Sequence, residues 1–243
     1  MVTLPPLHED LVFHGPLSSY RADLLVRSLG PLDGLHVVDL GCGWAELLLR
    51  TVAAGATGYG VDQDADAIAH GRKLAVERGL ADGVTLDVGD AGLWSGEADV
   101  LIVNGASQIW GGDPLTHTAN ALAAGRRFLR PGGRLLLGEG FWEREPTAAQ
   151  LAAMPVPREQ YGTVADLVDL AVEHGYRLLW LSQANQDEWD EFESGHGLAR
   201  ERWLLTHPDD TEVRERADRQ REWRLKGWRG VLGMAYLTLV VPT

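Results

Sequence analysis

Apolar stretches of strand length alternate with helix-like stretches along the first part of the chain. The apolar runs predict five strands, over residues 35–40, 57–61, 84–88, 98–103 and 134–138. Before and between them, apolar positions recur at helical spacing and predict helices over residues 18–29, 44–54, 64–79 and 113–130. Because strands that alternate with helices are typical of βαβ units, this pattern predicts a parallel sheet with helices packed against it.

The pattern changes after Gly140. Prolines mark an irregular connection, and a helix over 163–174 and a strand over 176–182 follow it. Residues 187–227 have helical spacing with a break at His207–Pro208, which predicts a two-helix insertion. A last apolar run over 231–241 predicts a seventh strand. The sequence therefore predicts a doubly wound α/β fold.

The chain length favours one large domain. With 243 residues, a single α/β domain with an insertion fits better than two independent domains. We expect one domain over 1–243, with an N-terminal cap segment (1–30), a Rossmann-like core (31–182 and 228–243) and a helical insertion (183–227).

Composition and charge narrow the possible partners. Lys and Arg number 22 against 35 Asp and Glu, a formal charge of −13, and the basic residues are scattered, so we expect no nucleic-acid partner. Cys42 is the single cysteine, which rules out an internal disulfide. The N-terminus lacks the pattern of a signal peptide, and the longest apolar run is too short to span a bilayer. We expect a cytoplasmic protein with no membrane partner, which could form a homodimer.

A glycine-rich turn follows the first predicted strand. The stretch V-V-D-L-G-C-G, residues 37–43, runs from a strand into a turn and then a helix. Gly41 and Gly43 allow the backbone to turn tightly and to approach a ligand. A dinucleotide-binding G-x-G-x-x-G motif would have a third glycine where Glu46 stands, and an acid there would repel a pyrophosphate. An NAD(P)-binding oxidoreductase therefore stays the second choice.

Acidic residues lie at the ends of three consecutive predicted strands. Asp39 precedes the glycine turn, where it could attract a cationic amino acid group. Asp62 follows the second strand and could accept both hydroxyls of a ribose. Asp90 follows the third strand and could accept a hydrogen bond from an adenine amino group. All three lie at the carboxyl edge of the predicted sheet, where open α/β sheets bind ligands.

Taken together, the motifs resemble class I S-adenosylmethionine-dependent methyltransferases. The resemblance rests on V-V-D-L-G-C-G, G-V-D-Q, V-G-D-A, A-D-V-L-I-V-N-G-A-S and L-R-P-G-G-R-L-L-L-G-E. Stretches such as H-G-P-L-S, N-G-A-S-Q-I-W-G-G and G-E-G-F-W-E-R-E-P are similar to a bacterial subgroup of small-molecule-type methyltransferases. The resemblance spans roughly residues 18–241 and implies a seven-stranded sheet whose last strand is antiparallel.

The resemblance also implies a cofactor, S-adenosyl-L-methionine, and its site. It places Gly41 and Gly43 on the methionine part, Asp62 on the ribose, Asp90 with Ala91 on the adenine, and Asn104 facing the transferred methyl group. The full expected cofactor set is Asp39, Gly41, Cys42, Gly43, Asp62, Gln63, Asp90, Ala91, Asn104 and Gly105.

The sequence indicates less about the methyl acceptor than about the cofactor. The Asn/Asp-Pro-Pro-Tyr motif of nucleic-acid amino methyltransferases is missing after strand four, so we expect a small-molecule acceptor. No acidic cluster or histidine spacing indicates a metal site. Methyl transfer would go to an O, N, C or S nucleophile by in-line displacement. The non-enzymatic alternative is a catalytically silent binding module with the same fold.

Two residues are candidates for catalysis, and several aromatic residues for acceptor binding. Glu139 follows strand five between two glycines and could act as a general base, and His14 lies in an N-terminal segment that could close over the cofactor. The expected substrate-binding residues are Tyr20, Trp110, Trp142 and Trp189. Aromatic residues at helical spacing in the insertion (Trp189, Phe192, His196 and Trp203) could form a lid or simply pack in a core.

Overall fold

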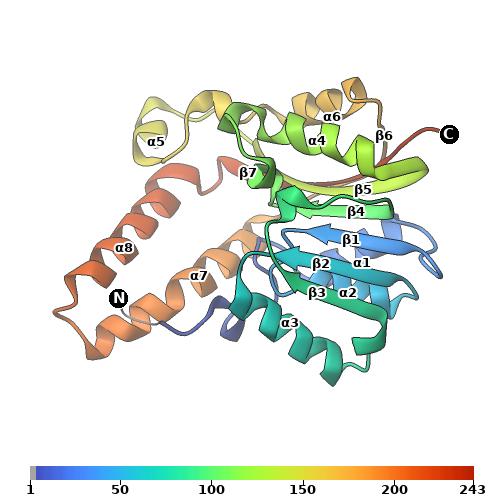
Figure 1. Cartoon of the computed structure of the whole chain (residues 1–243). Coiled ribbons are helices and arrows are strands. Elements are labelled where there is room, and N and C mark those ends of the chain that lie inside the picture. The colour runs from blue at the N-terminus through green and yellow to red at the C-terminus, as the bar shows by residue number, and fades with distance from the viewer. Residues whose placement is uncertain (1–3) are drawn as a thin grey trace.

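A single twisted sheet organises the computed structural model, which describes residues 4–243 (Figure 1). The first three residues of the expected N-terminal segment lie outside the described residues. The strand order is β3-β2-β1-β4-β5-β7-β6, and β7 runs antiparallel to both of its neighbours. The seven strands of the described chain are β1 (His36–Leu40), β2 (Thr57–Asp62), β3 (Val84–Val88), β4 (Ala98–Asn104), β5 (Leu129–Trp142), β6 (Arg177–Gln183) and β7 (Leu232–Val240). The predicted doubly wound fold with an antiparallel last strand is confirmed.

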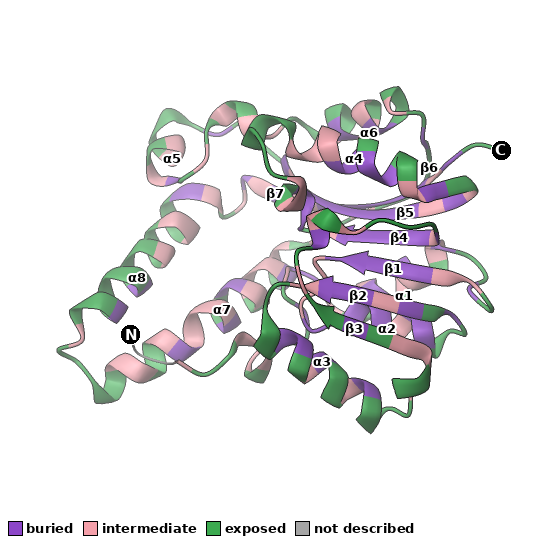
Figure 2. Ribbon diagram, in the orientation of Figure 1, coloured by how far each residue is buried: buried purple, intermediate pink, exposed green. Residues whose placement is uncertain are grey.

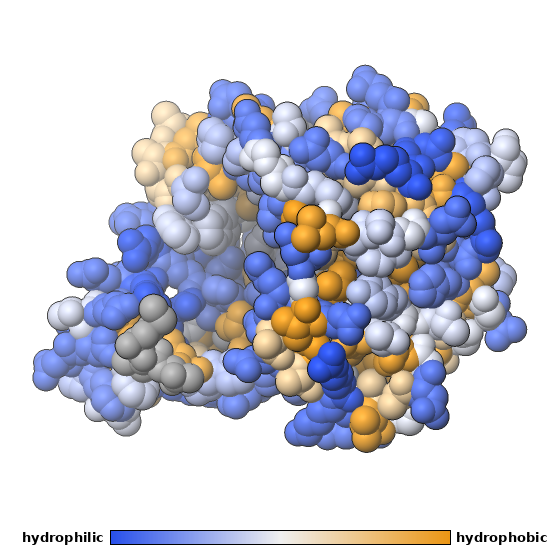
Figure 3. Space-filling model, in the orientation of Figure 1, coloured by the Kyte–Doolittle hydropathy of each residue, from blue (hydrophilic) through white to orange (hydrophobic). Residues whose placement is uncertain are grey.

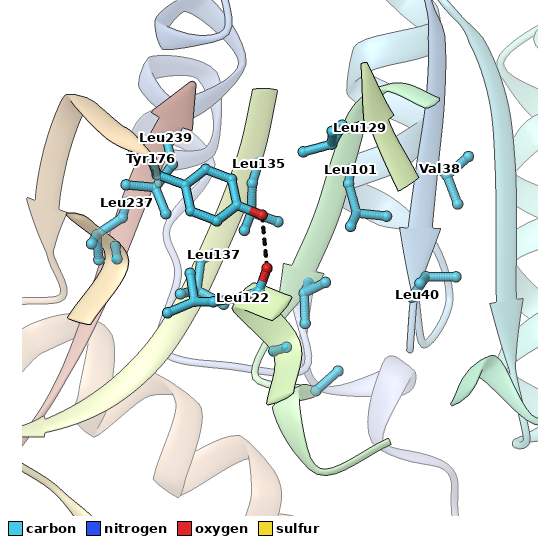
Figure 4. Close-up of a cluster of buried hydrophobic side chains, with 14 of the residues drawn as sticks. Val38, Leu40, Leu101, Leu122, Leu129, Leu135, Leu137, Tyr176, Leu237 and Leu239 are labelled. Carbon is cyan, nitrogen blue, oxygen red and sulfur yellow. Dashed lines mark hydrogen bonds between the residues drawn. The ribbon is translucent and has the colours of Figure 1, made fainter. Parts of the chain in front are cut away.

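Helices cover both faces of the sheet and bury its apolar side chains (Figure 2). One face packs against α1 (Ser19–Ser28), α2 (Glu46–Ala53) and α3 (Ala65–Glu77), and the other against α4 (His117–Phe128) and α6 (Val164–Glu173). The α4 and α6 side is shown in Figure 4, where the buried Tyr176 hydroxyl donates to the Leu122 carbonyl at 3.0 Å. Partnering that hydroxyl removes the cost of burying it among leucines.

Local sequence signals account for where several helices begin. Ser18 accepts a hydrogen bond from the Arg21 N–H at the start of α1. Asp64 accepts from two backbone N–H groups at the start of α3, and Thr163 forms a capping box at the start of α6. Side-chain oxygens at these positions satisfy backbone donors that a helix start leaves free.

Strand β5 is much longer than the predicted 134–138. It begins at Leu129 and continues through Gly138 and Gly140 to Trp142, because β7 pairs with it from Arg134 onward. The two glycines make room for side chains of neighbouring elements. A Cβ at Gly138 would collide with the Asn104 amide, and a Cβ at Gly140 would lie 2.7 Å from the Tyr161 ring.

The insertion before β7 consists of two antiparallel helices that extend beyond the sheet (Figure 1). These are α7 (Gln186–Thr206) and α8 (Thr211–Glu222), followed by a π-helical turn over Trp223–Trp228. A short helix, α5 (Ala148–Ala153), lies in the proline-rich connection, where no helix was expected. Short 3₁₀ turns complete the elements: η1 (Leu7–Glu9), η2 (Ala81–Gly83), η3 (Ala91–Leu93), η4 (Ser107–Trp110), η5 (Pro114–Thr116) and η6 (Arg158–Gln160). Within residues 4–243, no helix has the length and apolar character needed to cross a membrane.

Candidate functional site

A cavity of about 950 Å³ opens at the carboxyl ends of β1, β2 and β4. On the face seen in Figure 3, the surface is hollowed between the α7–α8 side and the sheet. Loops after the strands supply one side of the cavity, and the N-terminal segment and α7 supply the other. Every residue of the expected cofactor set lines it: Asp39, Gly41, Cys42, Gly43, Asp62, Gln63, Asp90, Ala91, Asn104 and Gly105.

The glycine turn adopts the conformation that its sequence suggests. Gly41 and Gly43 have φ values of 77° and 54°, in the left-handed region that disfavours side chains. A Cβ at Gly41 would also lie 2.5 Å from the Ala106 Cβ. The backbone N–H groups of Gly41 and Cys42 donate to the Val61 carbonyl, which ties the turn to β2. Any larger residue at Gly41 would therefore strain the turn and collide with Ala106.

Two carboxylates lie beside the turn with no basic partner among the described residues. Asp62 accepts hydrogen bonds from the Gly43 N–H at 2.8 Å and from the Asp64 N–H at 2.9 Å, which orient its carboxylate. Asp39 is buried, and that burial together with the charge of Asp62 raises its pKa to about 8. A cation in the cavity would relieve this cost, because it would stabilise both carboxylates in their charged form.

Residues after β3 and at the end of β4 complete the side of the cavity that lies next to the sheet. Asp90 caps η3 by accepting from the Gly92 N–H at 2.9 Å, and Ala91 is buried beside it. Asn104 ends β4, and its side-chain oxygen is buried against Gly138 without a hydrogen-bond partner among the described residues. A buried, unpartnered amide next to a cavity is a group that a ligand can satisfy.

Glu46 lines the cavity, but its carboxylate is already paired. It forms ion pairs with Arg50 at 3.0 Å and with Arg78 at 2.6 Å, and the side chain is buried. The two guanidinium groups compensate the charge of Glu46. This residue therefore does not add to the acidic pair of Asp39 and Asp62.

A row of rings forms the side of the cavity opposite the sheet. His14 lies 5.5 Å from the Trp44 ring and 6.3 Å from each of the rings of Phe192 and His196, measured between ring centroids. His14 remains exposed to the open cavity. Neighbours on its other sides desolvate the ring and lower its pKa below 6.5, although Asp62 and Asp64 act in the opposite direction. His14 is therefore neutral near pH 7.

Two residues on the side of the cavity opposite the sheet were not among the expected site residues. Trp44 follows the glycine turn directly, and its Nε1 donates to the Val12 carbonyl at 2.7 Å. Arg200 also lines the cavity, four residues after His196 on α7. The signal was present, since residues 192, 196 and 200 recur every four positions and so share one helix face.

The other expected site residues lie away from the cavity lining. Glu139 is buried on the α4 side of β5, where burial raises its pKa and hydrogen bonds to Ser107 and to the Gly140 N–H partly oppose this. Of the expected acceptor-binding residues, Trp142 is buried against Met154 and Val231, with its Nε1 donating to the Arg158 carbonyl.

The other three aromatic residues expected to bind the acceptor also lie outside the cavity lining. Tyr20 is 72% exposed on α1. Trp110 is the last residue of η4 and packs on the core cluster, and Trp189 lines a small pocket with residues of the π-helical turn and β7. Of the aromatic stripe in the insertion, Phe192 and His196 reach the cavity, whereas Trp203 stacks on His207 at the end of α7.

Known proteins are similar to this chain in sequence and in fold. Residues 31–188 match the model of a methyltransferase domain family. The chain is 31% identical to the uncharacterized protein YjhP of Escherichia coli over 202 residues, which cover 81% of this chain and 79% of YjhP. The crystal structure of YjhP has a TM-score of 0.86 at 28% identity and covers 97% of both chains.

Two further solved structures are described as S-adenosylmethionine-dependent methyltransferases in complex with S-adenosyl-L-homocysteine. One is from Geobacter sulfurreducens, with 29% identity, a TM-score of 0.85, and coverage of 99% of this chain and 100% of the other. The second is from Thiobacillus denitrificans, with 29% identity, a TM-score of 0.83, and coverage of 97% and 96%. The chain therefore belongs to the methyltransferase domain family, as a class I S-adenosylmethionine-dependent enzyme.

Proposed function

We propose that the cavity binds S-adenosylmethionine along the sheet edge and that the enzyme methylates a small molecule held against the α7 side. The observation that carries this proposal is the buried Asp39 next to the half-buried Asp62 beside the glycine turn. The pair needs a cation, and the amino group of the cofactor is one. When bound, S-adenosylmethionine supplies an electrophilic methyl group.

The remaining sheet-side residues fit the other parts of the cofactor. Asp62 has backbone donors on both oxygens and keeps further lone pairs for ribose hydroxyls. One oxygen of Asp90 is held by Gly92, which leaves the second for an adenine amino group. Asn104 has an unpartnered oxygen at the end of β4. The glycine turn brings the backbone close enough for these contacts.

The size and charge of the cavity support a small acceptor. A volume of about 950 Å³ is at the upper end of that found for small-molecule sites, so it has room for the cofactor and a compact second molecule. Among the charged side chains of the lining, acidic ones outnumber basic ones, which disfavours a phosphate backbone as the acceptor. An O, N, C or S atom of the acceptor would take the methyl group by in-line displacement. Holding that atom in line is the main contribution of such a site.

His14 is the candidate base that reaches the acceptor. Of the two residues expected to act in catalysis, His14 lines the cavity and Glu139 does not. The lowered pKa of His14 keeps the imidazole neutral near pH 7, so it can take the proton that an acceptor hydroxyl or amine loses. The groups around it are Asp62, Asp64, Trp44 and His196.

The first test is whether transfer occurs at all. Incubating the purified enzyme with S-adenosylmethionine and pooled metabolites should release S-adenosylhomocysteine and leave one compound heavier by a methyl group in mass spectrometry. If no acceptor is modified while S-adenosylhomocysteine still binds, the small-molecule proposal is wrong and the silent binding module becomes the better account.

A second test asks whether His14 acts as the general base. With the acceptor found above, His14→Asn should lower kcat by about 100-fold or more, the usual contribution of a general base, with little change in cofactor affinity. The wild-type rate should rise with pH through a pKa below 6.5, and the variant should lose this rise. His36→Asn is the matched control, because His36 begins β1 at the far edge of the sheet. A wild-type rate in His14→Asn would remove His14 from the mechanism.

A further inference from the structure

Charge is divided unevenly between the two sides of the cavity. The sheet side carries Asp39, Asp62 and Asp90, whereas Arg200 on α7 is the one lysine or arginine in the lining formed by residues 4–243. The neighbouring arginines differ from it. Arg202 pairs with Asp10 at 2.8 Å and Arg216 pairs with Glu212 at 2.6 Å.

Arg200 is held in place by neutral groups. Its Nη2 donates to the Gln220 side-chain oxygen and, at 3.0 Å, to the His196 carbonyl. Its Nε is buried without a partner, and no carboxylate of the described chain forms an ion pair with it. Burial and the charge of Arg216 lower the pKa of Arg200, in the direction expected for a guanidinium that lacks an anion. Such a charge is costly until an anion is bound.

Gln220 on α8 fixes the side chains around Arg200. Its side-chain nitrogen donates to His196 Nδ1 at 2.7 Å, while its oxygen accepts from Arg200. This hydrogen bond holds the His196 ring in one orientation, while burial and the charge of Arg200 lower the pKa of His196. The guanidinium is therefore positioned before any ligand arrives, which limits the entropy lost on binding.

Flat rings line the same side of the cavity as this guanidinium. Phe192 and His196 precede it on the same face of α7, with ring centroids 5.8 Å apart, and His14 lies against both. Such ring faces favour a planar ligand, because aromatic groups pack by offset or edge contacts. A guanidinium beside them can take a carboxylate in a two-pronged, charge-assisted contact.

We propose that the α7 side of the cavity selects a planar carboxylate as the methyl acceptor, with Arg200 binding its carboxylate and the rings of Phe192, His196 and His14 contacting its flat part. This inference rests on the proposed function, since it names the acceptor class of the same cavity. It places the acceptor beside His14, the proposed base. The carboxylate of the cofactor is the competing anion for Arg200, and the experiment separates the two.

The test uses benzoate as the probe and benzamide as its uncharged match. The full-length enzyme is first saturated with S-adenosylhomocysteine, and each probe is then titrated in while tryptophan fluorescence or heat is recorded. Benzoate should bind at least ten-fold more tightly than benzamide, because only benzoate can form the charge-assisted contact. Equal binding of the two probes, or no binding of benzoate, would overturn the proposal.

Variants assign the effect to Arg200. Arg200→Gln should weaken benzoate binding by about ten-fold or more and leave S-adenosylhomocysteine affinity unchanged, and Arg200→Lys should keep part of the benzoate preference. Arg214→Gln, an exposed residue of α8, carries the same charge change and should behave as wild type. If Arg200→Gln loses S-adenosylhomocysteine affinity as strongly as benzoate affinity, Arg200 holds the cofactor carboxylate and the acceptor proposal is wrong. Failure of the wild type to bind S-adenosylhomocysteine would instead contradict the proposed function itself.

Discussion

At the scale of single residues, the site contains two acidic side chains whose proximity is unfavourable. Asp39 is buried beside Asp62, and its pKa is raised to about 8. An unfolded chain releases the Asp39 proton near its ordinary value of 3.8, so at intermediate pH the folded state binds one proton more than the unfolded state. The contribution of Asp39 to stability is thus fully present below pH 3.8 and is lost as the pH rises toward 8.

The first prediction follows from that sign. The unfolding free energy of the ligand-free enzyme should fall between about pH 4 and pH 8, with Asp39 contributing up to about 1.4 kcal/mol per pH unit. Asp39→Asn removes the titrating group, so its stability should depend less on pH over this range. Urea unfolding at a series of pH values measures both curves. Parallel curves for the two proteins would show that Asp39 keeps an ordinary pKa.

The second prediction concerns the expected ribose and adenine contacts. Asp62→Ala should weaken S-adenosylhomocysteine binding by about 2–3 kcal/mol, because a charged acceptor of buried hydroxyls is lost. Asp90→Ala should cost less, since it removes one bond to the adenine. Calorimetric titration of both variants measures this, with the exposed Asp82→Ala as control. Wild-type affinity in both folded variants would mean that the ribose and adenine lie elsewhere.

At the scale of elements, the N-terminal segment is joined to α7 by a partly buried charge network. Glu188 at the start of α7 pairs with Arg21 at 2.7 Å and accepts hydrogen bonds from the Ser18 hydroxyl and backbone N–H. Burial raises the pKa of Glu188, but the hydrogen bonds from Arg21 and Ser18 outweigh it and the net pKa is lowered. The network holds the α1 end of the N-terminal segment against α7, on the side of the cavity that these two elements supply.

The third prediction tests that junction. Glu188→Gln leaves the Arg21 guanidinium without its charge partner and should destabilise the fold by about 3–5 kcal/mol, the cost of breaking a buried pair. Glu212→Gln breaks an exposed pair with Arg216 on α8 and should cost less than about 1 kcal/mol. Urea unfolding compares the two variants. Equal losses would show that the Glu188 network behaves as an ordinary surface pair.

Elements were predicted best where a local signal marks them. The strands through β4 and the helices that begin at Ser18, Asp64 and Thr163 follow from apolar runs and capping residues in the sequence. The length of β5 could not be read locally, because pairing with β7, about 100 residues away, keeps Gly138 and Gly140 in the strand. Tertiary pairing decides how far a strand extends where local propensity, which is low for glycine, does not.

The residues of the candidate site likewise fall into a part that the sequence predicts and a part that it does not. The cofactor residues are set by their positions at strand ends, so a parallel sheet brings Asp39, Asp62 and Asp90 together once the strands are known. The acceptor side depends on which face of α7 turns inward. That face carries Phe192, His196 and Arg200, whereas Trp189 lies on another face of α7, where it lines a small pocket with the π-helical turn. Periodicity shows that residues share a face but not which face the fold buries.

At the scale of the whole molecule, the cavity joins segments that are far apart in the sequence. The N-terminal segment around His14, the strand ends of the first half and α7 near residue 200 all line one space. Such a site forms only when the sheet, the N-terminal segment and the insertion are packed together. The acidic side next to the sheet and the arginine on α7 give it a cation-binding end and an anion-binding end.

Calorimetric titration of the purified enzyme with S-adenosylmethionine, S-adenosylhomocysteine and NADH tests the identity of the cofactor. We expect micromolar binding of both S-adenosyl compounds, equivalent to about −8 kcal/mol. We expect no comparable binding of NADH, because Glu46 occupies the position of the third glycine of a dinucleotide motif. No heat with either S-adenosyl compound, together with clear binding of NADH, would show that the cavity is a dinucleotide site instead.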